Sequence, residues 1–145
     1  MASQRLDLRS KLQSEVGSFV STLGYSGKLT VSAPYYPYDS LDGTEPYPNP
    51  DEPGCYVYAS GNGQVQKVGK ANRYLGNRIW APIGRRKKAG ETGELYPQAE
   101  TWLKENQPDI AVWAIAVPDE HWWLAAALEG FLTERLMPAK TTRQI

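Results

Sequence analysis

Two tyrosines and a lysine stand where a short hairpin would place them on one face of a sheet: Tyr56, Tyr58 and Lys67. An ammonium group beside a phenol favours the phenolate form, and a phenol that can lose its proton can act as a general base toward water. Tyrosine is also a good strand former, so the same residues have a purely structural interpretation. Both interpretations stay open on the sequence alone.

A glutamate and an arginine elsewhere in the chain extend this candidate set. Glu129 falls near the edge of the apolar stripe of a predicted C-terminal helix, where a carboxylate must be paired, bind a metal or reach solvent. A hard cation such as Mg²⁺ needs only one or two such carboxylates. Arg78 could bind a phosphate through its planar guanidinium group, or cover a helix surface with the aliphatic part of its side chain.

The net charge of the chain is zero, but its charges are unevenly distributed. Residues 54–89 contain no acidic residue, whereas residues 39–52 are acidic with no compensating base. A local basic surface suits a polyanion, because Lys and Arg replace the counterions of its phosphates. The alternative is a solvated surface with the acidic segment folded against it. The candidate nucleic-acid-binding residues are Lys70, Arg73, Arg85, Arg86, Lys87 and Lys88.

The hairpin that would position the tyrosines consists of two predicted strands, residues 54–60 and 64–69, around a Ser-Gly-Asn-Gly turn. If the two central residues of the turn are Gly and Asn, Tyr56 pairs with Lys67. If they are Asn and Gly, Tyr56 pairs with Gly69, and Lys67 lies diagonal to it on the same face. A three-residue turn would break this parity, so the neighbouring Tyr–Lys pair depends on the loop.

Hydrophobic periodicity and end signals predict the remaining elements. Residues 32–53 are rich in proline and tyrosine, which predicts an extended connector or arm rather than a packed element. Asp119 is expected to cap the last helix, and Met137-Pro138 to end it. The predicted helices span residues 6–23, 72–79, 97–106 and 119 to about 136, and a buried strand spans residues 109–118.

Length and composition indicate an ordinary globular protein. The chain has 145 residues, of which 41% are hydrophobic and 22% charged. Its one cysteine, Cys55, excludes an intrachain disulfide and is expected to be a small buried hydrophobe. No apolar run has the length of a membrane span, and no signal-peptide pattern is present. A soluble, cytoplasmic protein without membrane contact is therefore expected.

The order of these features resembles the GIY-YIG nuclease family over residues 54 to about 142. Gly54-Cys55-Tyr56 resembles the first half of the family's signature, and Lys67-Val68-Gly69 resembles the second half. Arg78 matches the arginine on the helix after the hairpin, and residues 111–117 resemble the third strand. Leu128-Glu129, with a proline downstream, resembles the helix that carries the metal-binding glutamate.

This resemblance implies an α/β (α+β) fold, a small antiparallel three-stranded sheet flanked by helices. Residues 54–145 would form the nuclease domain, and residues 1–53 would add an N-terminal helix and an extended arm. The family's function is metal-dependent hydrolysis of DNA phosphodiester bonds. Tyr56 would then act as general base or position the attacking water, Arg78 would stabilise charge on the phosphate, and Glu129 would hold one Mg²⁺ or Mn²⁺.

The chain also departs from the family pattern. Lys67 replaces the second signature tyrosine, as in some restriction endonucleases of the family, and a lysine can also orient water and neutralise phosphate. Thr141 or Thr142 stands near the place of the family's terminal asparagine. A catalytically inactive module of the same fold, binding DNA or another protein, is the alternative function. A homodimer is expected if the protein cuts duplex DNA at a symmetric site.

Overall fold

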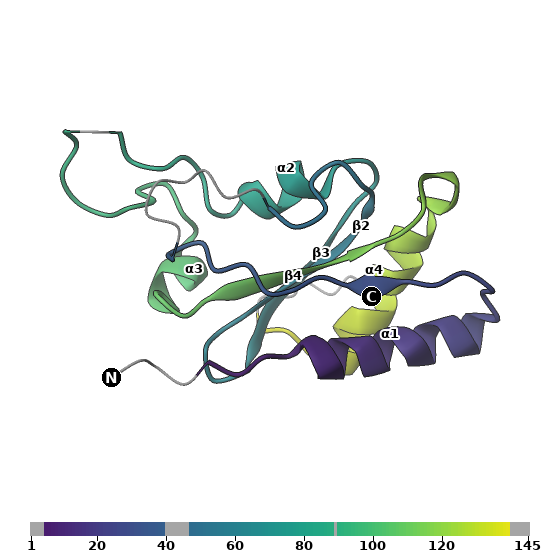
Figure 1. The fold of residues 1–145 in the computed structure, drawn as a ribbon. Coiled ribbons are helices and arrows are strands. Elements are labelled where there is room, and N and C mark those ends of the chain that lie inside the picture. Colours follow the sequence, from purple (N-terminus) through teal and green to yellow (C-terminus); the bar gives the residue numbers. More distant parts are fainter. Residues whose placement is uncertain (1–4, 40–46, 89, 140–145) are drawn as a thin grey trace.

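A four-stranded antiparallel sheet forms the centre of the computed structural model, which describes residues 5–39, 47–88 and 90–139 (Figure 1). In spatial order the strands are β1 (Thr30–Val31), β4 (Ala111–Ala116), β2 (Gly54–Ala59) and β3 (Val65–Ala71). β2 is buried along its whole length and pairs with β4 on one side and β3 on the other. The predicted hairpin and third strand are therefore confirmed, but the predicted number of strands is wrong.

The additional strand lies in the N-terminal part of the chain, where no strand was expected. β1 pairs with β4, and the residues after it continue along the same edge: the Ser32 amide donates to the Ala114 carbonyl (2.8 Å), and Tyr35 bridges to Val112. Two paired residues are too few to show the alternation that marks a strand. The first part of the segment predicted as an extended connector is thus packed, and it covers the open edge of β4.

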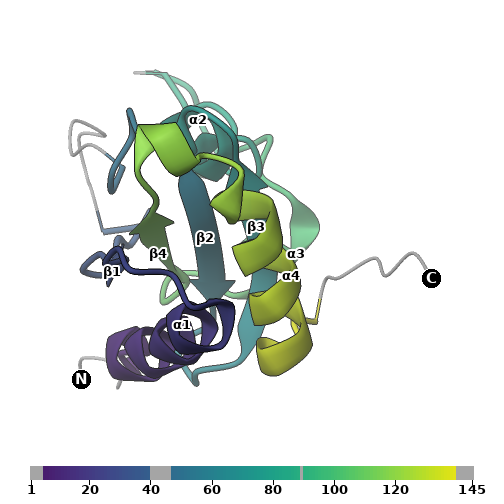
Figure 2. The same cartoon turned by 90° about the vertical axis from the view of Figure 1, so that its right-hand side faces the viewer.

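Helices cover both faces of the sheet, which gives three layers (Figures 1 and 2). α1 (Arg9–Leu23) and α4 (Leu124–Leu136) pack on the face that carries Cys55 and Val57. α2 (Leu75–Trp80) and α3 (Thr101–Glu105) pack on the face of Tyr56 and Tyr58. Because side chains alternate along β2, each face receives its own apolar cluster. α1 shares one cluster with α4 and β2, so residues before and after Gly54 contribute to the same core.

The helix ends differ from the predictions in small ways. α1 begins at Arg9 instead of residue 6, and α2 and α3 are shorter than predicted. The last helix is divided into a 3-10 turn at Asp119–His121 and α4, and neither begins with a side-chain cap, so the predicted capping by Asp119 is wrong. α4 ends at Leu136, and Met137 after it adopts a left-handed conformation before Pro138, where the helix was predicted to end. Within the described ranges no helix is long and apolar enough to cross a membrane.

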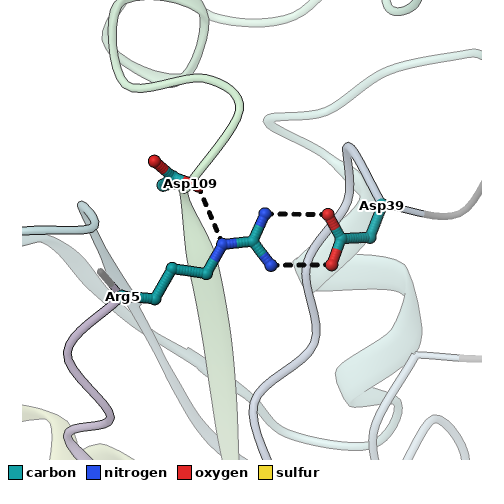
Figure 3. Close-up of polar contacts among 3 residues, drawn as sticks. All are labelled: Arg5, Asp39 and Asp109. Carbon is teal, nitrogen blue, oxygen red and sulfur yellow. Dashed lines mark hydrogen bonds and ion pairs between the residues drawn. The ribbon is translucent and has the colours of Figure 1, made fainter. Parts of the chain in front are cut away.

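An arginine near the N-terminus joins three distant parts of the chain (Figure 3). The guanidinium of Arg5 donates two hydrogen bonds to the Asp39 carboxylate, at 2.7 and 2.8 Å, and a third to Asp109 just before β4 at 2.8 Å. The same guanidinium lies over the ring of Tyr36, 4.1 Å from its centroid. These contacts hold the segment after β1 against the N-terminal end of β4.

Replacing Arg5 by alanine is expected to lower the free energy of unfolding by about 1–2 kcal/mol at neutral pH, because it leaves two carboxylates without their shared cation. Urea denaturation of wild type, Arg5→Ala and Arg5→Lys measures the loss. The lysine variant is expected to recover only part of the lost stability, since an ammonium group cannot reproduce the two parallel hydrogen bonds of the guanidinium. Equal stability of all three proteins would contradict the assignment.

The same cluster predicts how the effect depends on pH. Hydrogen bonding to Arg5 lowers the pKa of Asp39 from its ordinary value of 3.8, so the cluster's contribution is present above that value. The contribution is lost as the pH falls through the lowered pKa of the folded state. Wild type and Arg5→Ala are therefore expected to differ less in stability at low pH than at pH 7.

Candidate active site

The register of the hairpin decides where Tyr56 lies. Tyr56 pairs with Gly69 and Tyr58 with Lys67, which is the second of the two registers considered from the sequence. The loop has three residues, since the Ser60 amide donates to the Gln64 carbonyl at 2.9 Å, but a shift of register between Tyr58 and Ala59 restores the parity. Tyr56 and Lys67 therefore lie diagonally on one face.

Gly69 makes room for the ring of Tyr56. A β-carbon built on Gly69 would come within 2.2 Å of both the Cζ and the hydroxyl oxygen of Tyr56, a distance that no real contact permits. The ring thus crosses β3, the edge strand of the sheet, and carries its hydroxyl over Gly69. Only glycine leaves space for this placement without moving the tyrosine.

The two tyrosines of this face have different roles. Tyr58 is fully buried, and its hydroxyl donates a hydrogen bond to the Ile79 carbonyl at 2.5 Å, which anchors α2 to the sheet. The Tyr56 ring packs edge-on against Tyr58, with centroids 6.0 Å apart. Within the described ranges, the Tyr56 hydroxyl has no hydrogen-bond partner. Tyr58 is therefore structural, and Tyr56 is the tyrosine available to a ligand.

Glu129 lies on α4, close enough to two lysines of β3 for their charges to affect it. Burial raises the pKa of Glu129, while the charges of Lys70 and, less strongly, Lys67 lower it. These lysines extend to opposite faces of the sheet, since Lys70 pairs with Cys55 and Lys67 with Tyr58. A carboxylate that interacts with both lies beside the edge of β3. Within the described ranges it has no hydrogen bond and no ion pair.

The pKa of Tyr56 is raised to about 12, opposite to the direction expected from a neighbouring lysine. Burial is the largest cause, and the Glu129 carboxylate is the next; the Arg78 guanidinium opposes both. Lys67 is not among the groups that shift this pKa, and its Nζ faces another carboxylate. The phenol is therefore protonated at neutral pH, and its hydroxyl can both donate and accept a hydrogen bond.

That other carboxylate, Glu100, is a site residue that sequence analysis missed. It stands at the start of α3, and its Oε2 lies 3.9 Å from the Nζ of Lys67. Its charge also raises the pKa of Tyr56. Glu100 follows the basic loop at a distance in sequence that no local pattern connects to the hairpin, so only the packing of α3 against the sheet reveals it.

Arg78 lies in the last turn of α2 on the same side of the sheet as Tyr56. Its side chain is exposed and close enough to lower the pKa of Tyr56. No other described residue forms a hydrogen bond or ion pair with it. An unpaired guanidinium beside an unpaired phenol can bind two oxygens of one anion.

The other basic residues separate into two groups. Arg73 and Lys88 are exposed, and Lys70 contacts Asn72 at 3.3 Å, so these three remain accessible to a ligand. The rest are engaged within or beside the loop of residues 84–94. Arg85 pairs with Glu91 at 3.3 Å, Lys87 donates to the Gly93 carbonyl at 3.2 Å, and Arg86 lies 5.9 Å from the ring centroid of Tyr96. The loop residues are therefore less available to phosphates than their charge alone indicates.

The charges of Arg78, Glu100 and Glu129 act on Tyr56, and those of Lys70 and Lys67 act on Glu129, so the four residues nominated from the sequence as catalytic share one electrostatic neighbourhood with two others. The set is Tyr56, Lys67, Lys70, Arg78, Glu100 and Glu129. Comparisons of the chain with protein-family models, with curated proteins and with solved structures found no match. The gathering of these side chains at the edge of β3 is hence the basis for inferring what the chain does.

Proposed function

We propose that the chain is a metal-dependent nuclease of the GIY-YIG type that hydrolyses phosphodiester bonds in DNA. One observation carries the proposal: the Tyr56 hydroxyl lies over Gly69 of the edge strand β3, within electrostatic range of the Arg78 guanidinium and the half-buried Glu129 carboxylate, and none of the three has a hydrogen-bond or ion-pair partner in the described ranges. Polar groups left unpaired in one place are typical of a site that binds a ligand. The ordered resemblance to the family supports a phosphodiester as that ligand.

The cations of the site suit a phosphodiester. Arg78 would donate two hydrogen bonds to the non-bridging oxygens, which carry more charge in the transition state than in the ground state. Lys67 supplies a second positive charge on the same face, and Glu100 holds it in place at 3.9 Å. Lys70 and Arg73 continue the positive charge toward the neighbouring phosphates of the strand.

Tyr56 would orient the attacking water. Its neutral hydroxyl can accept a hydrogen bond from that water. At the same time its own O–H can donate a hydrogen bond to a phosphate oxygen. The water oxygen bonds to phosphorus and the ester bond to the leaving oxygen breaks. One proton of the water ends on the leaving oxygen, which becomes a hydroxyl, and the other passes to solvent.

Glu129 is the residue that would hold a divalent cation, Mg²⁺ or Mn²⁺. The fit is supported by its chemistry, because a partly desolvated carboxylate with no other partner gains a counter-charge on binding one. A single carboxylate suffices for a cation that keeps most of its waters. When bound, such a cation polarises the phosphate and stabilises charge on the leaving oxygen.

Incubation of the purified chain with supercoiled plasmid tests the proposal. Cutting is expected with Mg²⁺ or Mn²⁺ and not with EDTA, and the ratio of nicked to linear product reports whether one strand or both are cut. If no single-stranded, duplex or branched DNA is cut but binding weakens steeply with salt, the chain is instead an inactive DNA-binding module.

Gly69→Ala is expected to reduce cleavage about 100-fold, because the added methyl group displaces the ring of Tyr56 by an ångström or more. Single-turnover rates at saturating DNA measure the effect. Gly17→Ala on α1 is the matched control, since its added methyl group meets nothing within 4 Å. An equal rate for Gly69→Ala and wild type would show that the position of Tyr56 does not matter for cutting.

A further inference from the structure

Large aromatic side chains are exposed at the end of the sheet where α2 and α4 begin. Tyr74, which precedes α2, is 50% exposed, and Trp80 at its end is 48% exposed. Trp122, which follows the 3-10 turn before α4, is 48% exposed. Large aromatic side chains gathered on a surface mark a binding site more often than chance exposure does.

Two cavities flank Tyr74, each of about 590 Å³. The first, here called the Trp122 cavity, is lined by Pro53, Asn72, Arg73, Tyr74, Asp119 and Trp122. The second, here called the Trp80 cavity, lies between Tyr74, Trp80, Asn77 and the segment that includes Tyr47 and Asp51. Tyr74 therefore forms a wall common to both, and each cavity has another aromatic side chain in its lining.

The polar groups of these cavities suit a nucleobase better than a phosphate. Asp119 and Asp51 would repel a phosphate placed inside. The same carboxylates can accept hydrogen bonds from an exocyclic amino group, and Asn72 and Asn77 can donate to and accept from a base edge. Tyr74, Trp122 and Trp80 offer rings on which the flat faces of bases stack. Arg73, which also lines the Trp122 cavity, supplies a positive charge for the phosphate that joins two such bases.

The Trp122 cavity is close to the strand that carries Tyr56. Pro53 precedes Tyr56 by three residues along an extended strand, a span of about 10 Å. A stacked strand of DNA rises 3.4 Å per nucleotide, so this span corresponds to about three nucleotides. Bases inside a duplex are covered by their neighbours and partners, so only unpaired nucleotides can enter.

We propose that the Trp122 and Trp80 cavities bind consecutive unpaired bases of a DNA strand, with Tyr74 stacked between them. The position of these bases relative to the cut rests on the proposed nuclease function, but their binding does not. The preferred substrate is accordingly DNA with a single-stranded segment beside the scissile phosphate, such as a flap, a bubble or a frayed end.

Binding measured without cleavage tests this inference. Fluorescence anisotropy in EDTA compares a labelled single strand, the matching blunt duplex and the same duplex with a single-stranded flap. Wild type is expected to bind the single strand and the flap more tightly than the duplex. Tyr74→Ala and Trp122→Ala are each expected to weaken single-strand binding about 10- to 100-fold, since stacking on one base contributes about 1–3 kcal/mol.

Matched variants separate stacking from folding. Trp123→Ala removes an equally exposed tryptophan, 53% exposed, that lines neither cavity, and it is expected to leave affinity unchanged. Tyr74→Phe keeps the ring, so recovery of affinity relative to Tyr74→Ala assigns the loss to the ring. If Tyr74→Ala fails to fold, Trp122→Ala compared with Trp123→Ala carries the test. Equal affinity for single strand and duplex would overturn the proposal, as would equal losses in Trp122→Ala and Trp123→Ala.

Two further outcomes distinguish this inference from the nuclease proposal. If the protein prefers single strands but cuts no DNA, the base-binding role of the cavities is supported and only the nuclease proposal is refuted. If the protein cuts plasmid without any preference for unpaired bases, only the base-binding role is refuted. Self-association in sedimentation that Trp122→Ala abolishes, without a preference for single strands, would assign the aromatic surface to a second copy of the chain and overturn the base-binding role.

Discussion

Glu129→Gln is expected to abolish metal-dependent cleavage, with a loss of about 10³-fold or more in the single-turnover rate. Glutamine keeps the shape of the side chain and removes the charge that would hold the cation. Among the described residues, Glu100 is the only carboxylate besides Glu129 whose charge shifts the pKa of Tyr56, and Glu100 faces Lys67. Cleavage is measured over a range of Mg²⁺ concentrations, so that weaker cation binding and slower chemistry are seen separately.

The same substitution is expected to preserve or slightly raise the melting temperature. Burial raises the pKa of Glu129, so its charged form is less stable in the folded chain than in water, and the neutral glutamine escapes this cost. Glu134→Gln is the control on the same helix, because Glu134 is exposed and does not shift the pKa of Tyr56. A Glu129→Gln protein that is both active and metal-dependent would place the cation elsewhere.

Tyr56→Phe is expected to lower the cleavage rate by about 10² to 10⁴-fold while the protein stays folded. The variant removes a hydroxyl that has no hydrogen-bond partner among the described residues, and it keeps the ring that packs against Tyr58. Substrate affinity is expected to change little, because the ring and the basic residues remain. Rates at saturating DNA, together with anisotropy for binding, measure the two effects independently.

Tyr58→Phe supplies the opposite pattern as a control. Its hydroxyl donates to the Ile79 carbonyl in a buried environment, so its loss is expected to cost about 1–3 kcal/mol of stability and little activity below the melting transition. Tyr56 and Tyr58 are adjacent on the same face of β2, two residues apart in the sequence. If Tyr58→Phe were the inactive variant and Tyr56→Phe the active one, the assignment of the reactive tyrosine would be reversed.

Local patterns predict most of the elements of this fold. The runs of β2 and β4 are buried on both faces of the sheet, and Leu12, Val16 and Phe19 recur at helical spacing on the buried face of α1, so each element has a local signal. β1 was missed because its pairing depends on β4, which lies more than eighty residues later in the chain. A short edge strand of this kind is specified by its partner rather than by its own residues.

Most members of the candidate site could be predicted from the sequence, but Glu100 and the electrostatics of the site could not. Tyr56, Arg78 and Glu129 carry chemistry that their positions in the sequence already suggest. The pKa of Tyr56 follows from burial and from Glu129, and both are consequences of how α4 and α3 pack around the edge of β3. Charge counting along the chain also overstated the basic loop, because Glu91 and the loop's own carbonyls engage Arg85 and Lys87.

The anchoring of the N-terminal segment determines the order in which this chain can fold. Arg5 bonds to Asp109 across 104 residues, and Asp7 accepts a hydrogen bond from the Trp113 indole across 106. Contacts between such distant positions form late, because a long loop must close first. During synthesis from the N-terminus, the apolar face of α1 therefore stays exposed until β4 has emerged. We expect the nascent chain to be most prone to aggregation during that interval.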